Sequence, residues 1–211
     1  MNTISYDTFL DKIHGCWYGK CLGGAAGAPV EGIKKIIEVE DFTEIFDPDL
    51  PNDDLDIQLL WLDVLEHKGV QINACDLADA WIEKCWYPFS EYGYFMKNYM
   101  RGVKPPYTGI INNSFFKEGM GCPIRSEIWG CIAAGNPKLA ADYAYMDGCL
   151  DHADNSVHAE QFLFKSFQSF PPFFDMTDPA FPAKTKSTLP GADSCLKAGG
   201  QTKNAPGTGC I

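Results

Sequence analysis

The sequence has no long run of apolar residues and little positive charge. Its first eight residues are already polar in part, so neither a signal peptide nor a membrane-spanning segment can be read from them. Seventeen Lys and Arg against 28 Asp and Glu give a formal net charge of -11. This charge opposes binding to phosphate backbones, because nucleic-acid affinity comes from clustered cations. These absences predict a cytoplasmic protein that acts neither on a membrane nor on a nucleic acid.

Patterns that indicate zinc sites or disulfide frameworks are also missing. No Cys-x-x-Cys pair occurs, and none of the four histidines lies at zinc-finger spacing from a cysteine. The nine cysteines are an odd number in a chain of 211 residues that shows no export signal. We therefore expect the cysteines to be reduced thiols and expect no structural zinc.

The sequence does contain helical periodicity. Apolar residues recur near helical spacing over residues 6–22, and the following segment, 23–29, has almost no side chains, so other atoms must approach its backbone closely. A second helix is predicted over 53–67, with Asn52 as its N-cap and Gly69 as its C-terminal stop. Patterns typical of strands and hairpins are scarce. The sequence predicts an all-α fold, with further helices at 74–86, 91–100, 125–134, 137–146 and 157–167.

The composition changes near Gln168. Residues 168–211 are rich in Pro, Thr, Lys, Ser and Gly and show no helical periodicity. Such a segment can bury little apolar surface. We expect one helical domain over residues 1–167, followed by an irregular or disordered tail over residues 168–211.

Oxygen ligands gather where the second helix is predicted to start. Asn52, Asp53 and Asp54 are consecutive, and Asp56 follows one turn beyond the first two. Mg²⁺ commonly takes one or two carboxylates together with waters, so this cluster is a candidate metal site. The helix dipole alone also favours acidic residues in a first turn. Simple capping is therefore the alternative explanation.

Three other segments could carry chemistry, and each has an ordinary structural alternative. Glu31, after the small-residue segment, could act as a base or a gate, or be a surface glutamate. Gly119 and Gly121 precede a predicted helix. Free backbone N–H donors there could bind a phosphate, or the segment could be an ordinary turn at the helix entry. His152 and Asn155 lie between two predicted helices and could offer acid–base or polar binding groups. The alternative is that this junction is a solvated loop, as most such junctions are.

Taken in order, these segments resemble the ADP-ribosylglycohydrolase family, whose relatives include dinitrogenase reductase-activating glycohydrolase. The resemblance rests on residues 15–32, 51–54, 119–125 and 147–155, and it covers residues 10 to 167. It implies an all-α fold with two Mg²⁺ ions between helices. It also implies cleavage of the glycosidic bond that joins ADP-ribose to a protein side chain or to a small acceptor.

The resemblance also implies a role for each candidate residue. Asn52, Asp53 and Asp54 match the first metal segment of the family, although Leu55 stands where a hydroxyl residue is usual. Glu31 matches the catalytic or gating glutamate. The residues implied to contact the substrate are Gly119, Gly121, His152 and Asn155.

The chain departs from the family pattern toward its C-terminus. The family supplies a second metal segment resembling Gly-Asp-Thr-Asp-Thr, and residues 175–178 and 191–193 match it poorly. We interpret the chain as cut short before that segment. Two hypotheses follow: a magnesium-dependent hydrolase of ADP-ribosyl conjugates, or a catalytically inactive remnant that is a nucleotide-binding or structural helical module.

Overall fold

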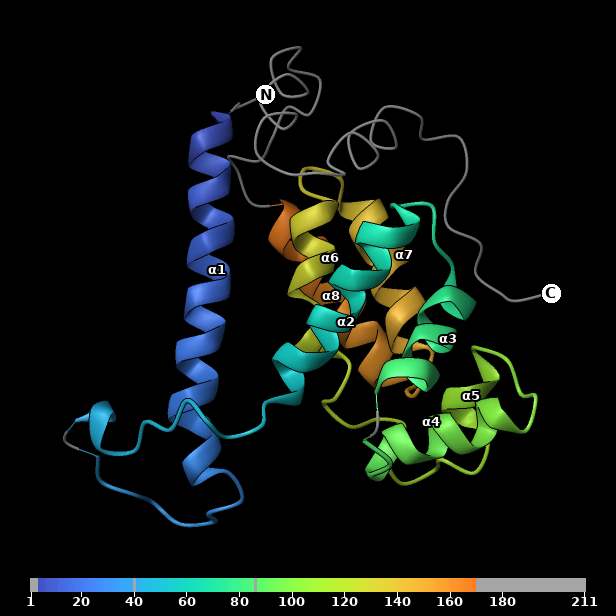
Figure 1. Cartoon of the computed structure of the whole chain (residues 1–211), viewed down its shortest axis with the longest axis horizontal. Helices are drawn as coiled ribbons and strands as arrows, with labels where there is room; N and C mark the ends of the chain where they lie inside the picture. The colour runs from blue at the N-terminus through green and yellow to red at the C-terminus, as the bar shows by residue number, and fades with distance from the viewer. Residues whose placement is uncertain (1–3, 40, 86, 170–211) are drawn as a thin grey trace.

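The computed structural model describes residues 4–39, 41–85 and 87–169, which form helices and no strand (Figure 1). The all-α prediction is therefore confirmed. Apart from its first two residues, the predicted tail lies outside the described residues. The α-helices are α1 (Tyr6–Gly27), α2 (Asp53–Lys68), α3 (Ala74–Lys84), α4 (Ser90–Met100), α5 (Tyr107–Ile110), α6 (Glu127–Ile132), α7 (Pro137–Gly148) and α8 (Asn155–Ser169), and the 3₁₀ turns are η1 (Ala28–Val30), η2 (Phe42–Glu44) and η3 (Pro123–Arg125).

Side-chain caps fix several of the helix starts. At the start of α1, the Ser5 hydroxyl accepts a hydrogen bond from the backbone N–H of Thr8 at 3.1 Å. Asn73 and Asp76 form a reciprocal capping box at α3. Asn136 accepts a hydrogen bond from the first turn of α7. Each cap satisfies a backbone donor that the helix leaves unpaired, so the local sequence determines where these helices begin.

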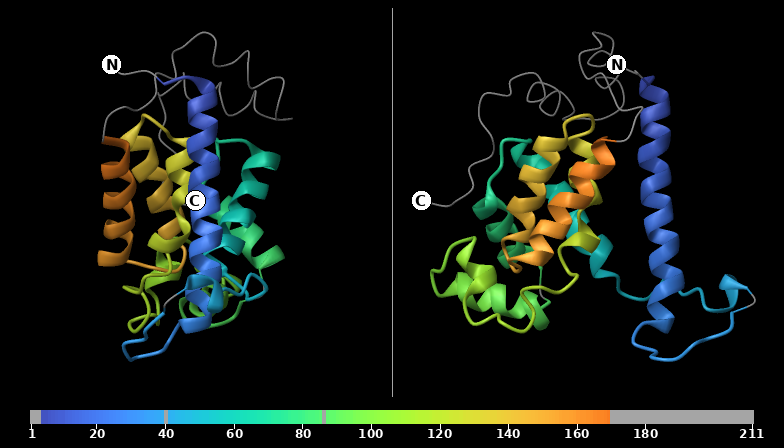
Figure 2. Two further views of the ribbon diagram at one scale, coloured as in Figure 1. Left: turned by 90° about the vertical axis from the view of Figure 1, so that its left-hand side faces the viewer. Right: turned by 180° about the vertical axis from the view of Figure 1, so that it is seen from behind.

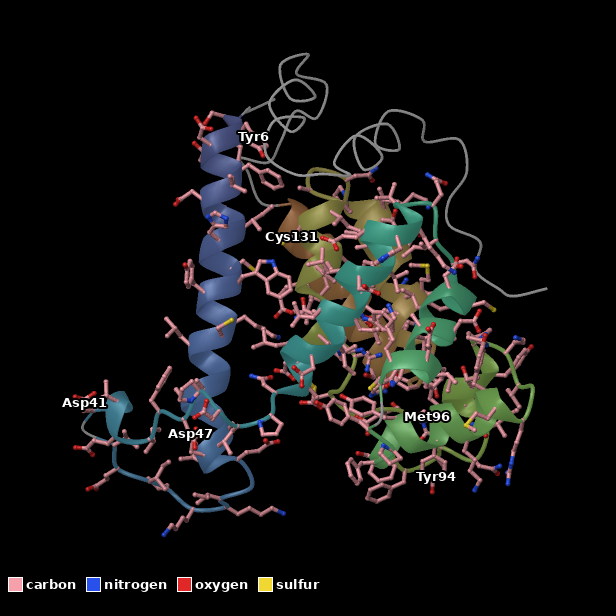
Figure 3. The ribbon with its side chains drawn as sticks, in the orientation of Figure 1. Tyr6, Asp41, Asp47, Tyr94, Met96 and Cys131 are labelled. Atoms are coloured by element: carbon pink, nitrogen blue, oxygen red, sulfur yellow. The ribbon has the colours of Figure 1, made fainter. Side chains whose placement is uncertain are left out.

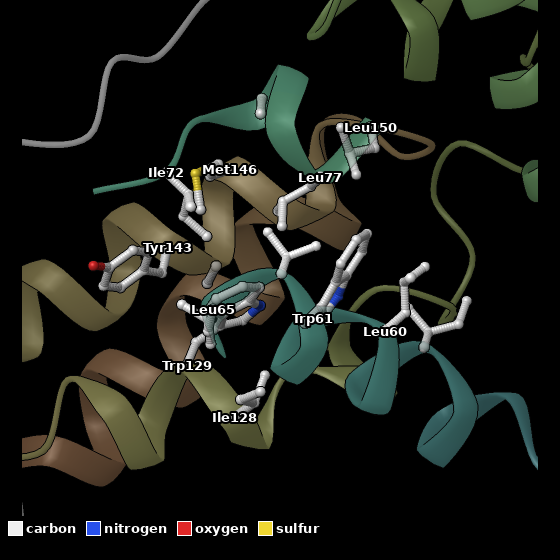
Figure 4. Close-up of a cluster of buried hydrophobic side chains, with 14 of the residues drawn as sticks. Leu60, Trp61, Leu65, Ile72, Leu77, Ile128, Trp129, Tyr143, Met146 and Leu150 are labelled. Carbon is white, nitrogen blue, oxygen red and sulfur yellow. The ribbon is translucent and has the colours of Figure 1, made fainter. Parts of the chain in front are cut away.

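The core is built around three fully buried tryptophans. Trp61 of α2 contacts Trp81 of α3 edge-on, with ring centroids 5.6 Å apart, and lies 6.4 Å from Trp129 of α6. Trp129 in turn stacks on Tyr143 of α7 at 5.4 Å. Figure 4 shows the rings of Trp61, Trp129 and Tyr143 among aliphatic side chains of α2, α3 and α7. Helix α2 therefore lies at the centre of the domain, as its apolar sequence predicts.

Helix α1 runs along one side of this body and has no buried residue (Figures 1 and 2). Trp17 packs against the core from α1. The close approach predicted for the small-residue segment occurs at Gly24, where an added Cβ atom would lie 1.8 Å from Asn52 Nδ2. Glycine at this position therefore lets the start of α2 contact the backbone of α1.

The state of the cysteines and the character of the helices bear on two further predictions. Among the described residues, six cysteines are free thiols and Cys75 is disulfide-bonded, so the prediction that all nine are reduced is wrong at Cys75. None of the helices in the described ranges combines the length and the apolar character that a membrane crossing requires.

Candidate active site

Helix α2 begins at Asp53, directly after Asn52. Asn52 is extended (φ -140°, ψ 96°), as an N-cap should be, but its side chain makes no capping hydrogen bond. Instead, its amide group packs on Gly24 of α1. Asn52 therefore does not cap α2 through its side chain, whereas Asp53, Asp54 and Asp56 lie in the first turn, where the helix dipole alone also favours acidic residues.

A lysine from α1 reaches into this cluster. Lys20 Nζ lies 3.7 Å from Asp54 Oδ2 and donates a hydrogen bond to Glu127 Oε1 at 2.8 Å. Burial raises the pKa of Asp54, Lys20 opposes that rise, and the neighbouring carboxylates of Asp53 and Glu127 add to it. Three carboxylates, those of Asp53, Asp54 and Glu127, therefore lie near one ammonium group.

Asp53 is held from the opposite side by α4. The Tyr92 hydroxyl donates a hydrogen bond to Asp53 Oδ2 at 2.8 Å. Burial raises the pKa of Tyr92, so this phenol stays protonated and remains a donor. One oxygen of the Asp53 carboxylate is thus engaged by the protein.

A buried ionic network lies behind this cluster. The Arg125 guanidinium donates to both oxygens of Asp151, at 2.8 and 2.7 Å, and to Asp147 Oδ1 at 2.9 and 3.1 Å. The indole N–H groups of Trp61 and Trp129 donate to the other oxygen of Asp147. All three charged side chains are fully buried, and every charge in the network has partners.

His152 extends this network toward α4. Its Nδ1–H donates to Asp151 Oδ1 at 2.8 Å, and its Nε2 lies 3.7 Å from Glu91 Oε1. Among the described residues, Nε2 has no hydrogen-bond partner, and the ring is only 1% exposed. A Cβ atom on Gly121 would lie 2.4 Å from Glu91 Oε1 and 2.8 Å from His152 Cε1. Only glycine fits between the carboxylate and the imidazole.

The structure brings together three of the four residues implied to contact the substrate. A Cβ atom on Gly119 would lie 3.8 Å from His152 Nε2, so Gly119, Gly121 and His152 are neighbours. Asn155 lies at the exposed start of α8 and donates to Glu118 Oε2 at 2.6 Å. No described contact tests whether any of these side chains binds a substrate, so these roles stay predictions.

Glu31 follows η1 and is exposed. Its backbone N–H donates to the carbonyl of Ala28. Ionised carboxylates neither pair with nor donate to one another, so the contacts do not test how near Glu31 lies to Asp53 and Asp54. The predicted proximity of Glu31 to these carboxylates and its catalytic role both stay predictions.

Several residues of this region were not predicted from the sequence. Lys20 and Glu127 contact each other across 107 positions, and Tyr92 reaches Asp53 across 39. Glu91 is an ordinary acidic residue in a first helical turn, where the dipole favours it. No local pattern distinguishes these residues from surface positions.

The donor set fits a hydrated magnesium ion in part. Asp53 and Asp54 supply two carboxylates, which is a common protein contribution to bound Mg²⁺ when waters complete the octahedron. In the part of the chain that the structure describes, no group of three or more His, Cys, Asp and Glu side chains is placed to hold a metal. Asp53 and Asp54 would therefore hold the ion, and most of its remaining ligands would be waters.

Comparison with known proteins identifies the family of the chain. The family model for ADP-ribosylglycohydrolase matches residues 5–164, so the chain belongs to that family. Neither a curated protein nor a solved structure gives a significant match. The family comprises hydrolases that act on ADP-ribosylated substrates and are generally metal-dependent.

Proposed function

We propose that this chain uses Mg²⁺, held by Asp53 and Asp54, to hydrolyse the glycosidic bond of an ADP-ribosylated protein or a small ADP-ribosyl conjugate. The observation that carries the proposal is the carboxylate pair at the start of α2. Asp54 is half-buried and has a raised pKa, and Lys20 compensates its charge only in part. A divalent cation would supply the missing positive charge.

When bound, Mg²⁺ would polarise and orient the ribose hydroxyl groups or a water molecule. The residues of the chain would fix the geometry. Asp53 is oriented by Tyr92, and the His152 ring is held by Asp151, which Arg125 anchors in turn. Such fixed groups lower the cost of arranging the reacting atoms.

The remaining roles rest on the family match. The backbone around Gly119 and Gly121 would accommodate the substrate beside His152, and Asn155 would bind it from the start of α8. Glu31 would assist attack at the anomeric carbon as a base, from the turn that follows α1. The first metal segment would include Asn52, whose amide packs on Gly24.

A binding module without turnover is the second candidate. The small donor set favours it, because two carboxylates leave Mg²⁺ largely hydrated and loosely oriented. Both candidates use the same residues. Mg²⁺ binding is common to them, and release of ADP-ribose separates them.

The test uses the full chain and two measurements. Mg²⁺ binding is measured by calorimetry, and release of ADP-ribose is measured from peptides ADP-ribosylated on arginine or serine. The double variant Asp53→Asn/Asp54→Asn should lose at least tenfold in Mg²⁺ affinity and all turnover, by removing both charged ligands. Asp56→Asn is the matched control, because Asp56 lies in the same helical turn but is exposed.

Two outcomes would count against the hydrolase. Turnover that persists in the double variant, or in excess chelator, would show that the reaction does not depend on these carboxylates. Mg²⁺ binding without any turnover on either peptide would favour the binding module.

A further inference from the structure

We propose that Tyr92 is a positioning residue of the metal segment, whose hydroxyl fixes the Asp53 carboxylate for Mg²⁺. The inference rests on the proposed magnesium site. Its central observation is the 2.8 Å hydrogen bond from the Tyr92 hydroxyl to Asp53 Oδ2. This contact joins the first turn of α4 to the first turn of α2.

The Tyr92 ring cannot easily turn away. It is 6% exposed, and its centroid lies 5.3 Å from that of Trp81. The guanidinium carbon of Arg125 lies 5.8 Å from the same ring, and Arg125 is itself locked between two buried carboxylates. The hydroxyl therefore projects from a rigid part of the core toward a helix start.

A fixed donor on one carboxylate oxygen determines where the other oxygen points. Asp53 Oδ2 accepts from Tyr92, which leaves Oδ1 available to an ion. Carboxylates that bind metals are commonly held in this way by a second hydrogen bond, and loss of such a partner typically costs about 10- to 100-fold in metal affinity. The role of Tyr92 is thus to act through Asp53 and not on the substrate.

Glu91, the residue before Tyr92, joins the same turn of α4 to His152. Glu91 precedes Tyr92 in the same turn and faces His152 Nε2 at 3.7 Å. Because consecutive residues of one turn contact Asp53 and His152, α4 sets the spacing between the carboxylate segment and the imidazole.

The chain contains a matched control for this arrangement. The Tyr87 hydroxyl donates to Asp56 Oδ2 at 2.5 Å, which repeats the tyrosine-to-aspartate contact three residues further along α2. Asp56 is exposed and is not one of the proposed metal ligands. Tyr87→Phe therefore removes the same chemical group from a contact with the same helix, α2, without removing a contact of the proposed metal ligands.

The experiment compares Mg²⁺ affinity by calorimetry for the wild type, Tyr92→Phe and Tyr87→Phe. Tyr92→Phe should weaken Mg²⁺ binding by about tenfold, and Tyr87→Phe should leave it unchanged. Circular dichroism and a thermal melt confirm that each full-length variant is folded. A purely structural role would lower the melting temperature without this selective loss of affinity.

A double-mutant cycle asks whether Tyr92 acts through Asp53. In an Asp53→Asn background, Tyr92→Phe should have no further effect on Mg²⁺ affinity, because its partner carboxylate is gone. Equal affinity of Tyr92→Phe and wild type would overturn the proposal, and so would an undiminished effect in the Asp53→Asn background. Absence of Mg²⁺ binding in the wild type would overturn it together with the metal site. Loss of affinity in a chain without turnover would support the positioning role and reject only the proposed reaction.

Discussion

Arg125 and Asp151 form a fully buried, bidentate ion pair, with nitrogen-to-oxygen distances of 2.8 and 2.7 Å. The same Asp151 oxygen that accepts from Arg125 Nη2 also accepts from His152 Nδ1. Burial alone would raise the pKa of Asp151, but Arg125 and His152 hold it below its ordinary value. The pair therefore keeps Asp151 ionised and fixes the imidazole that Asp151 holds.

Replacing Arg125 should be among the most damaging changes to the fold. Arg125→Met keeps most of the side-chain volume but leaves Asp147 and Asp151 buried without a cation. We expect a loss of about 3–5 kcal/mol in the free energy of unfolding, measured by urea denaturation. Arg101→Met removes an exposed arginine and should change stability by less than about 0.5 kcal/mol. Similar losses for the two variants would contradict the importance assigned to the buried pair.

Glu160 should make stability depend on pH. Burial and the neighbouring Asp147 raise its pKa well above the ordinary value. A carboxyl group with a raised pKa contributes stability that is fully present below its unfolded pKa, about 4.3. That stability is lost as pH rises toward the folded pKa, by up to about 1.4 kcal/mol per pH unit. Glu160→Gln, which keeps the acceptor for Ser126, should therefore become more stable relative to wild type between about pH 5 and pH 8.

Urea melts at several pH values check this expectation. The exposed Glu83→Gln is the control and should track the wild type at every pH. If the difference in the free energy of unfolding between Glu160→Gln and wild type stays constant between about pH 5 and pH 8, Glu160 is already ionised in the folded protein, and the expectation is wrong.

Gly121 should tolerate no side chain. In Gly121→Ala, the new methyl group would meet the Glu91 carboxylate and the His152 ring, so one of them must move. We expect a loss of about 1–3 kcal/mol in stability by thermal or urea unfolding, together with weaker ligand binding. Gly23→Ala is the control, because no atom lies within 4 Å of its added Cβ and alanine favours the helix. An equal effect at both positions would contradict the close packing at Gly121.

Cys16 should react as a thiolate near neutral pH. The hydrogen bond from Cys131 lowers the pKa of Cys16 to about 7, against burial and Glu127, which raise it. Cys131 lies on the side of the body that faces α1 (Figure 3). Alkylation of Cys16, followed by mass spectrometry, should rise through a midpoint at about pH 7.

The variant Cys131→Ala tests the cause of that low pKa. Without the hydrogen bond, the pKa should return toward about 8.5 and the rate at pH 7 should fall by roughly tenfold. The control Cys149→Ala changes a buried thiol on another part of the fold and should leave the rate unchanged. An unchanged rate in Cys131→Ala would exclude the hydrogen bond as the cause.

Much of the fold could be predicted because it depends on local sequence. Asn73 and Asn136 cap their helices through neighbouring backbone groups, and the apolar content of α2 already predicts a central helix. Helix ends were predicted less well. The predicted helix at 125–134 begins two residues later, as α6, because η3 extends through Arg125. Such ends depend on tertiary contacts that periodicity does not contain.

The candidate site could be predicted only in outline. The motifs indicate Asp53, Asp54 and His152, but spacing does not reveal that Lys20 and Tyr92 contact the two carboxylates from other helices. These contacts join segments far apart in sequence, and the side chains involved are ordinary in their local context. Glu31 is the opposite case: its motif implies a catalytic role, but none of the described contacts supports that role.

The position of α1 affects the order in which the protein can assemble during synthesis. Lys20 meets Ile124 and Glu127, which lie 104 and 107 positions later in the chain. At about 5–20 residues per second, a ribosome would need roughly 5–20 s to add those residues. During that time, any helix that forms in α1 has to be stable without these partners. Its 22 residues and the Ser5 cap favour an isolated helix, since helices shorter than about 12–15 residues are marginal in water, but its five glycines weaken it, so its packing on the body does most to hold it helical.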